Sequence, residues 1–101
     1  MSVSDADIAF AMDLFADLGD VSYRKMFGGL GLYIEGAIFA LVSSDGAIYL
    51  KATGEFASEL KDEGSSQFHS MPYWSLPDAA LEDPEMALSL ARRGVIELMA
   101  M

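Results

Sequence analysis

The fold is decided by residues 23–51, which read YRKMFGGLGLYIEGAIFALVSSDGAIYLK. Aliphatic, aromatic and β-branched residues fill four runs in this stretch, and glycine, serine or aspartate separates each run from the next. Such spacing is typical of a meander of antiparallel strands. The sequence therefore predicts four consecutive strands, at residues 23–27, 30–35, 37–42 and 47–51.

The glycines between the first two strands stand in the order Gly28-Gly29-Leu30-Gly31. Glycine loops that bind phosphate lead from a strand into a helix, whereas these glycines lie between two predicted strands. We therefore interpret them as a tight hairpin turn with a bulge, where glycine supplies a positive φ or room for a close backbone approach.

The third predicted strand is apolar on both faces, because every residue from Ile38 to Val42 is apolar. This pattern is typical of a central strand that is covered by helices or by a partner. If the helices cover one face only, the other face offers Tyr33, Tyr49 or Phe39 to a second copy of the chain. The pattern therefore predicts a homodimer.

A helix is predicted before the strands, at residues 4–18, where apolar residues recur at spacings of three and four. Ser4 and Asp7 resemble a capping box at its start, and Gly19 is the expected C-terminal cap. After the strands, residues 55–63 are expected to form a short second helix.

The last third of the chain holds two predicted short strands, at residues 67–70 and 73–76, followed by a helix. Asp83-Pro84 opens that helix, with aspartate as the N-cap and proline in the first helical position. Gly94 within it favours a bend or an early end. Together these elements predict one α+β domain over residues 1–101: an antiparallel β-meander sheet with about three helices packed mainly on one face.

The 101 residues include sixteen acidic and six basic side chains, which gives a net charge of −10 at pH 7. Proteins that bind nucleic acid draw most of their affinity from basic side chains on phosphates, so this charge argues against direct nucleic-acid binding. It argues equally against an anionic membrane surface. Cysteine is absent, and the first seven residues contain acids but no base. We therefore expect no disulfide, no signal peptide and a cytoplasmic location.

Catalytic and metal sites find little support in the sequence. His69 is the only histidine, and no nucleophile-elbow motif accompanies it, so we expect a surface or interfacial histidine. The acidic cluster from Asp78 to Glu85 lacks the ligand spacing of a calcium-binding loop. We therefore expect no catalytic residue, no metal and no cofactor, and a protein that is not an enzyme.

Two pairs of basic residues stand out on so acidic a chain. Arg24 and Lys25 alternate across the first strand, so one of them faces the core side and is expected to pair with a carboxylate. Arg92 and Arg93 lie in the last helix, where we expect them to complement the helix dipole and to form salt bridges with acidic helices.

The segment Met71-Pro72-Tyr73-Trp74 concentrates large apolar groups in an irregular part of the chain. Tyrosine and tryptophan are favoured anchors at protein interfaces, and they also commonly cover a core. Both interpretations stay open from the sequence alone.

Several ordered motifs resemble the N-terminal domain of the TfoX family, the competence regulators also called Sxy. The residues from Arg24 to Tyr33 follow the family's pattern of an arginine-led R-x-M-F-G-G-x-G strand and turn. The other motifs follow in the family's order, at Phe39–Val42, Asp45-Gly46, Ile48–Lys51 and Met71–Trp74. The resemblance covers nearly the whole chain and implies an α+β domain of about this length.

The resemblance brings no catalytic residue with it. Full-length competence regulators of the family carry a second, C-terminal helical domain and work with a catabolite-activator-type protein at promoters. This chain ends at Met101, so it is similar to the stand-alone versions of the domain found in bacteria. The resemblance therefore implies a regulatory role.

We accordingly predict a small, non-enzymatic regulatory or protein-interaction domain with a protein partner. The alternative is a small-ligand-binding protein or an enzyme that uses a pocket near the glycine turn and Tyr73-Trp74. The residues predicted to form the interaction surface or pocket are Arg24, Lys25, Phe27, Gly28, Gly29, Gly31, Lys51, Tyr73 and Trp74.

Overall fold

The computed structural model describes residues 3–26 and 28–99. Within these residues, five antiparallel strands lie side by side in the order in which they occur in the chain. Their bounds are β1 Val21–Met26, β2 Gly29–Ile34, β3 Ala37–Val42, β4 Ile48–Lys51 and β5 Tyr73–Ser75. The predicted α+β fold and the four strands of the central stretch are confirmed.

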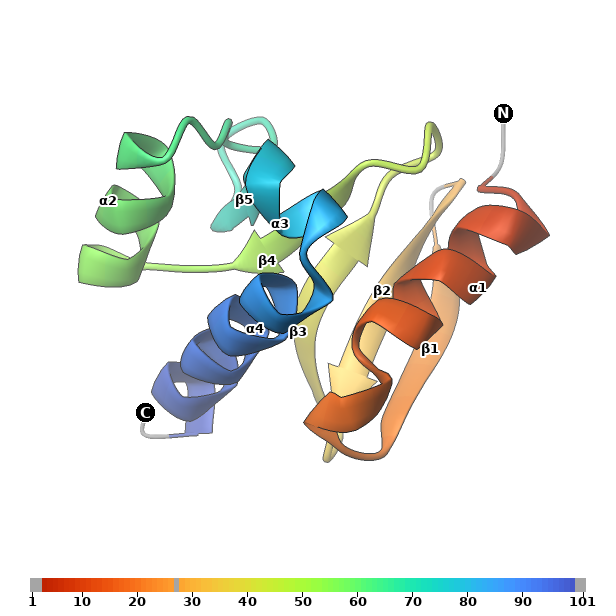
Figure 1. Cartoon of the computed structure of the whole chain (residues 1–101). Coiled ribbons are helices and arrows are strands. Elements are labelled where there is room, and N and C mark those ends of the chain that lie inside the picture. Colours follow the sequence, from red (N-terminus) through yellow and green to blue (C-terminus); the bar gives the residue numbers. More distant parts are fainter. Residues whose placement is uncertain (1–2, 27, 100–101) are drawn as a thin grey trace.

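The described residues also form four α-helices and one 3₁₀ turn, namely α1 Asp5–Leu14, η1 Ala16–Leu18, α2 Gly54–Asp62, α3 Asp78–Glu82 and α4 Pro84–Met99. α1 and α4 pack against each other on the same face of the sheet (Figure 1). The helices therefore form one layer and the sheet forms the other. No helix among residues 3–26 and 28–99 has the length and apolar character needed to cross a membrane.

The core lies between these two layers. Leu30, Leu32 and Ile34 alternate along β2 and are all buried beneath the helices. Phe15 packs edge-on against Phe39, with 5.5 Å between the ring centroids. Both layers contribute the largest fully buried side chains, which are Phe15, Phe56, Leu30, Leu32, Leu50, Leu60 and Val42. Burial of this apolar surface is the main source of the domain's stability.

A register shift between β2 and β3 places two consecutive residues of β3 on the core side. Phe39 and Ala40 both turn toward the core, where they are 2% and 0% exposed. The bulge that produces the shift lies near Tyr33, and not at the glycine turn where the sequence predicts it. Phe39 is therefore not available to a second copy, and this part of the prediction is wrong.

The first helix is shorter than predicted. The Asp7 N–H donates to Ser4 Oγ at 3.1 Å, which confirms the N-terminal cap. The α-helix ends at Leu14, and η1 then leads to Gly19, whose φ is 148°. Gly19 therefore ends the 3₁₀ turn rather than the α-helix, because the last helical turn tightens to satisfy its carbonyl groups.

Residues 67–70 do not form the predicted strand. Their one β-type pairing is an isolated bridge between Gln67 and Trp74. His69 has a φ of 54°, and the Met71 N–H donates to the Phe68 carbonyl at 3.1 Å, so the chain turns here. The sequence also does not predict α3, because a helix of five residues is too short to show a helical period.

Gly94 does not end the last helix early, so of the two predicted outcomes, a bend or an early end, the early end is wrong. α4 continues without interruption to Met99. A Cβ atom at position 94 would meet the Phe56 ring at 3.1 Å and the Lys51 carbonyl oxygen at 3.4 Å. Glycine therefore lets α4 approach α2 and the end of β4 closely, which offsets its low helix propensity.

The polar residues of α4 follow the prediction in part. Asp83 Oδ1 accepts from the Glu85 N–H at 3.1 Å, which confirms the N-cap. Arg93 forms an ion pair with Glu59 of α2, and Arg92 Nη2 donates to a carbonyl of η1 at 3.3 Å. Neither arginine lies in the last turn of α4, so the predicted dipole interaction is wrong.

Candidate interaction surface

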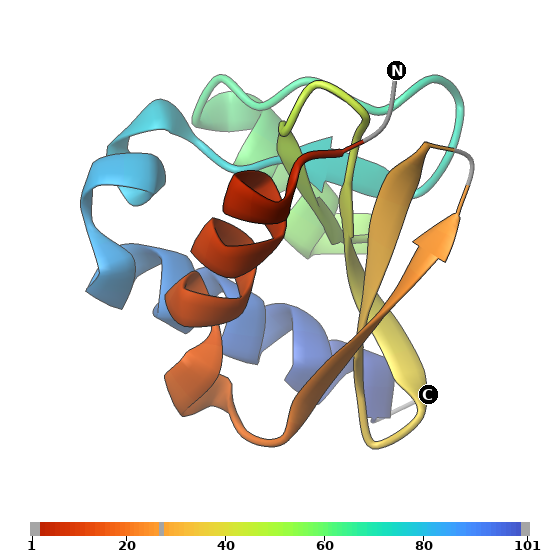
Figure 2. The ribbon, with the colours of Figure 1, turned by 90° about the vertical axis from the view of Figure 1, so that its right-hand side faces the viewer.

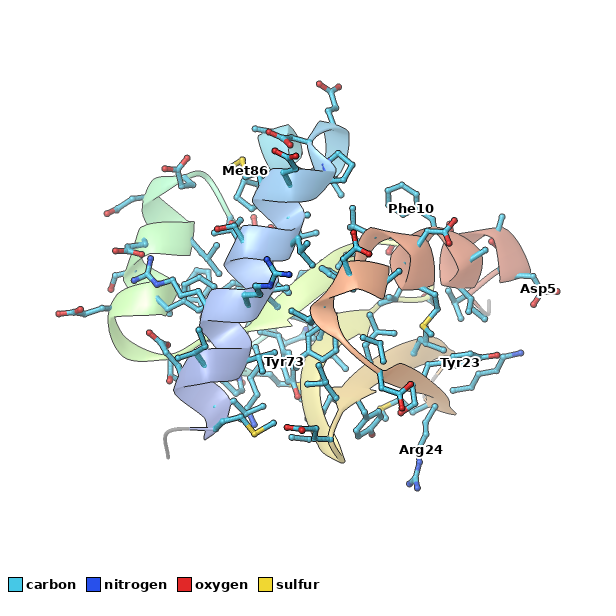
Figure 3. The ribbon with its side chains drawn as sticks, turned by 60° about the horizontal axis from the view of Figure 1, so that its bottom comes forward. Asp5, Phe10, Tyr23, Arg24, Tyr73 and Met86 are labelled. Atoms are coloured by element: carbon cyan, nitrogen blue, oxygen red, sulfur yellow. The ribbon has the colours of Figure 1, made fainter. Side chains whose placement is uncertain are left out.

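One face of the sheet carries the helices, and the opposite face carries none in the described part of the chain (Figure 2). We call this the open face. On β1, Arg24 points away from the helices (Figure 3). Strand alternation and the pairing register assign the residues of the open face: Ser22, Arg24, Met26, Gly29, Gly31, Tyr33, Ile38, Leu41, Tyr49, Lys51, Tyr73 and Ser75.

Apolar side chains close over a glycine at the centre of the open face. A Cβ atom on Gly31 would meet Met26 Cε at 2.9 Å, Ile38 Cδ1 at 3.1 Å and Tyr33 Cε1 at 3.2 Å. The guanidinium carbon of Arg24 lies 5.9 Å from the centroid of the Tyr33 ring. A cation therefore stands directly beside this apolar cluster.

The loop between α2 and β5, residues 63–72, packs along one side of the open face, and we call it the wall. Phe68 packs on Tyr49 with the ring centroids 4.8 Å apart, and His69 packs edge-on against Phe68 at 4.5 Å. The Phe68 N–H donates to the Tyr73 carbonyl at 2.8 Å, which ties the wall to β5. Met71 is 44% exposed. The wall thus presents an aromatic and flexible apolar surface.

A pocket of about 390 Å³ lies between this wall and the end of the β1–β2 hairpin. It is lined by Met26, Gly29, Leu30, Ile38, Leu41, Val42, Ser43, Ser44, Phe68, His69, Met71 and Tyr73. Most of these residues are apolar, and the volume lies within the roughly 300–1,000 Å³ of typical small-molecule sites. The pocket can therefore receive a whole apolar side chain or a small molecule.

The charges of the chain are separated between the sheet and the rest of the molecule. None of the sixteen acidic residues lies in a described strand, whereas Arg24, Lys25 and Lys51 do. Helices and loops therefore carry the carboxylates, and the strands contribute only the cations of Arg24 and Lys51 to the open face. On a chain of net charge −10, this arrangement favours a ligand that brings negative charge to the open face.

Two side chains near the pocket have shifted pKa values. Burial raises the pKa of the Tyr73 hydroxyl, and the neighbouring Tyr33 raises it further. The pKa of Asp45 is lowered because the Ser43 hydroxyl and the Ala47 N–H donate to its carboxylate. Tyr73 is therefore neutral at physiological pH, and Asp45 fixes the β3–β4 turn that closes one end of the pocket.

Comparison with known proteins assigns the chain to a family. The family model of the TfoX N-terminal domain matches residues 13–97. The chain belongs to the TfoX N-terminal domain family. The resemblance carried by the sequence motifs is therefore confirmed.

Two curated relatives of this TfoX N-terminal domain match about half of the chain. One is the DNA transformation protein TfoX1 of Aliivibrio fischeri, which is 41% identical over 51 residues, or 50% of this chain and 24% of that protein. The other is Protein Sxy of Escherichia coli, 38% identical over 56 residues, or 55% of this chain and 26% of that protein. The matches thus span about a quarter of each relative.

The structure brings together part of the predicted site of this TfoX N-terminal domain. Gly29 and Tyr73 line the same pocket. Gly28 lies exposed in the hairpin turn with a φ of 80°, and Phe27 lies outside the described residues. The predicted residues that share the open face are Arg24, Gly29, Gly31, Lys51 and Tyr73.

Lys25 and Trp74 lie on the helix side of the sheet. Lys25 pairs in register with Leu30 and shares its side, but it is exposed. Lys25 forms no ion pair with residues 3–26 or 28–99, so the prediction that it pairs with a carboxylate is wrong. The ammonium group lies on an edge strand, where water solvates it. Trp74 packs against the core, as expected if this residue covers the core rather than anchoring an interface. Tyr73 instead lines the pocket.

The predicted site residues of the TfoX N-terminal domain do not include several residues that line the pocket, in particular Ile38, Leu41, Phe68 and Met71. Strict strand alternation would place Ile38 and Leu41 on opposite faces of the sheet. They share a face because the bulge inserts one extra residue between them. His69 is exposed at the rim of the pocket, in agreement with the predicted surface histidine. Among the described residues, no group of three or more histidines and carboxylates is placed to hold a metal ion.

Proposed function

We propose that the chain is a non-enzymatic regulatory domain that binds a protein partner through its open face. The observation that carries this proposal is an apolar and aromatic sheet face that no described helix covers. Exposed apolar areas with a polar rim mark interaction sites in soluble proteins. The proposed location is the cytoplasm, which the absence of cysteine supports.

The family supports a regulatory role. One relative is named a DNA transformation protein, and the chain matches about a quarter of that protein's length. We propose that this chain shares a TfoX-like role in regulation, and that it does so by protein contact rather than by contact with DNA. The charge distribution supports the second part, because the helices and loops are strongly acidic.

Site-specific photo-crosslinking in the native cell tests this proposal. A photoreactive phenylalanine analogue at position 33 samples the open face, and the same analogue at the exposed Phe10 samples the outside of α1. We expect a discrete protein adduct from position 33 and none from position 10. Adducts from position 10 alone, or from neither position, would contradict the proposal.

A small-ligand-binding protein or an enzyme is the second candidate function, and the pocket of about 390 Å³ favours it. Tyr73 and His69 are the titratable groups of the lining, which holds no carboxylate in the described residues. Native mass spectrometry of the protein purified from its own cells separates the two candidates. A retained small molecule would support the ligand-binding function.

The isolated protein is expected not to bind duplex DNA near physiological salt. A DNA-binding protein commonly neutralises about six to ten phosphates, whereas the strands bring only Arg24 and Lys51 to the open face of a chain with net charge −10. Fluorescence anisotropy with a labelled duplex measures this directly. Salt-sensitive binding at submicromolar protein would overturn the prediction.

The homodimer predicted from the sequence is the alternative occupant of the open face. Tyr33 and Tyr49 lie there, so two copies could bury the face against each other around a two-fold axis. Sedimentation velocity at micromolar concentration measures the mass. A species of twice the monomer mass would support the homodimer.

A further inference from the structure

We propose that the open face recognises an acidic peptide segment of the partner, whose one large apolar side chain enters the pocket. This inference rests on the proposed protein-binding function and adds the chemistry of the partner. It combines two independent observations on the same face: an apolar pocket, and two cations, Arg24 and Lys51, on described strands that hold no carboxylate.

The pocket provides the anchor site. Ile38 and Leu41 form its apolar floor, and methionines stand on both sides of it, Met26 on β1 and Met71 on the wall. Methionine side chains are flexible and polarisable, so they adapt to apolar side chains of different shape. Binding energy at protein interfaces concentrates in a few large side chains that fill such pockets. One apolar anchor in the partner therefore fits this geometry.

The cations provide the preference for acidic neighbours of that anchor. Arg24 lies on the same face of β1 as Met26, two residues along the strand, and it points outward (Figure 3). Lys51 belongs to the same face on β4, beside Tyr73. Neither Arg24 nor Lys51 forms an ion pair with another described residue, so carboxylates of a bound segment can neutralise these cations.

The net charge of −10 does not cancel this attraction at contact distance. At physiological ionic strength the screening length is about 8 Å, so carboxylates on the helix side act weakly on a ligand at the open face. The net charge slows the approach of an acidic segment, and the local cations determine which segment remains bound.

The same charges argue against a second copy of this chain as the occupant. A two-fold interface between open faces places the same residues on both sides. Arg24 and Lys51 would then meet a face whose described strands offer no carboxylate. An acidic segment of another protein is the better complement.

Selection from a random-peptide phage library on the immobilised full chain tests the proposal. We expect enriched peptides that combine one aromatic or branched aliphatic residue with neighbouring aspartate or glutamate. A fluorescent synthetic copy of an enriched peptide is then titrated with the wild-type protein and three variants, whose folding is checked by circular dichroism.

The variants separate the two parts of the inference. Arg24→Glu should weaken binding about three- to tenfold, as expected for a contact at the rim. Lys25→Glu makes the same change of charge at the neighbouring position on the opposite face, and it should leave the affinity unchanged. Leu41→Asp should weaken binding at least about tenfold, because it places a charge in the pocket.

Each outcome bears on the proposal. Loss with Leu41→Asp but not with Arg24→Glu would overturn the acidic preference and leave the protein-binding function standing. Equal effects of Arg24→Glu and Lys25→Glu would show charge steering and overturn the proposed contact. No enriched peptide, or binding that no open-face variant changes, would contradict both the inference and the proposed function. A stable homodimer that Leu41→Asp dissociates would show that a second copy is the occupant, which also overturns the inference.

Discussion

Replacement of Phe56 by alanine is expected to lower the free energy of unfolding by about 3–5 kcal/mol. The Phe56 side chain is fully buried, and its ring lies against the backbone of α4 at Gly94. The guanidinium carbon of Arg93 lies 5.1 Å from the ring centroid. Truncation leaves a cavity where α2 meets α4, and Gly94 has no side chain to fill it. The total free energy of unfolding of a small domain is about 5–15 kcal/mol, so the expected loss is a large fraction of it.

Urea unfolding followed by circular dichroism measures this change. Phe10→Ala is the matched control, because Phe10 is 49% exposed on α1 and should change the free energy of unfolding by no more than about 0.5 kcal/mol. A loss below about 1 kcal/mol for Phe56→Ala would show that α2 and α4 do not pack as described.

Replacement of Gly29 by valine is expected to lower the free energy of unfolding by about 2 kcal/mol or more. Gly29 does not have a positive φ, so a turn conformation is not the reason. A Cβ atom at this position would overlap with the backbone carbonyl oxygen of Val42 and would lie 3.3 Å from Ser43 Cα. Since the obstacle is backbone, the β2–β3 pairing itself has to move.

Gly31→Val provides the comparison within the same strand, and thermal unfolding of both variants measures the difference. The atoms that a Cβ on Gly31 would meet belong to the side chains of Met26, Ile38 and Tyr33, and the Met26 terminus can rotate away. The loss should therefore be smaller, at about 1 kcal/mol. Equal stability of Gly29→Val and the wild-type protein would contradict the close approach of β2 and β3.

The sheet could be predicted from the sequence because its determinants are local. Turn residues separate the strands between Tyr23 and Lys51, and the strands pair in chain order, so no long-range choice remains. The role of Gly94 could not be predicted in the same way. It depends on the distance between α4 and Phe56, which is a property of the packed structure and not of the helix sequence.

The candidate site was predictable only in part, for a related reason. Arg24, Gly29 and Tyr73 are predictable because each stands in a conspicuous local motif. Ile38 and Leu41 are not predictable in this way, since the bulge between β2 and β3 puts residues three apart on one face. Phe68 joins the site through a loop whose path is set by contacts with Tyr49 and β5, and the sequence of the loop alone does not reveal these contacts.

Nuclear magnetic resonance of the methyl-labelled protein, titrated with an enriched acidic peptide, tests the central claim most directly. The described structure provides two sets of apolar reporter residues. The pocket is lined by Met26, Ile38 and Leu41 of the open face and by Met71 of the wall, and exposed positions on the helices are Leu81, Ile96 and Met99. The account predicts shift changes in the first set and none in the second. Changes confined to Leu81, Ile96 and Met99 would contradict it.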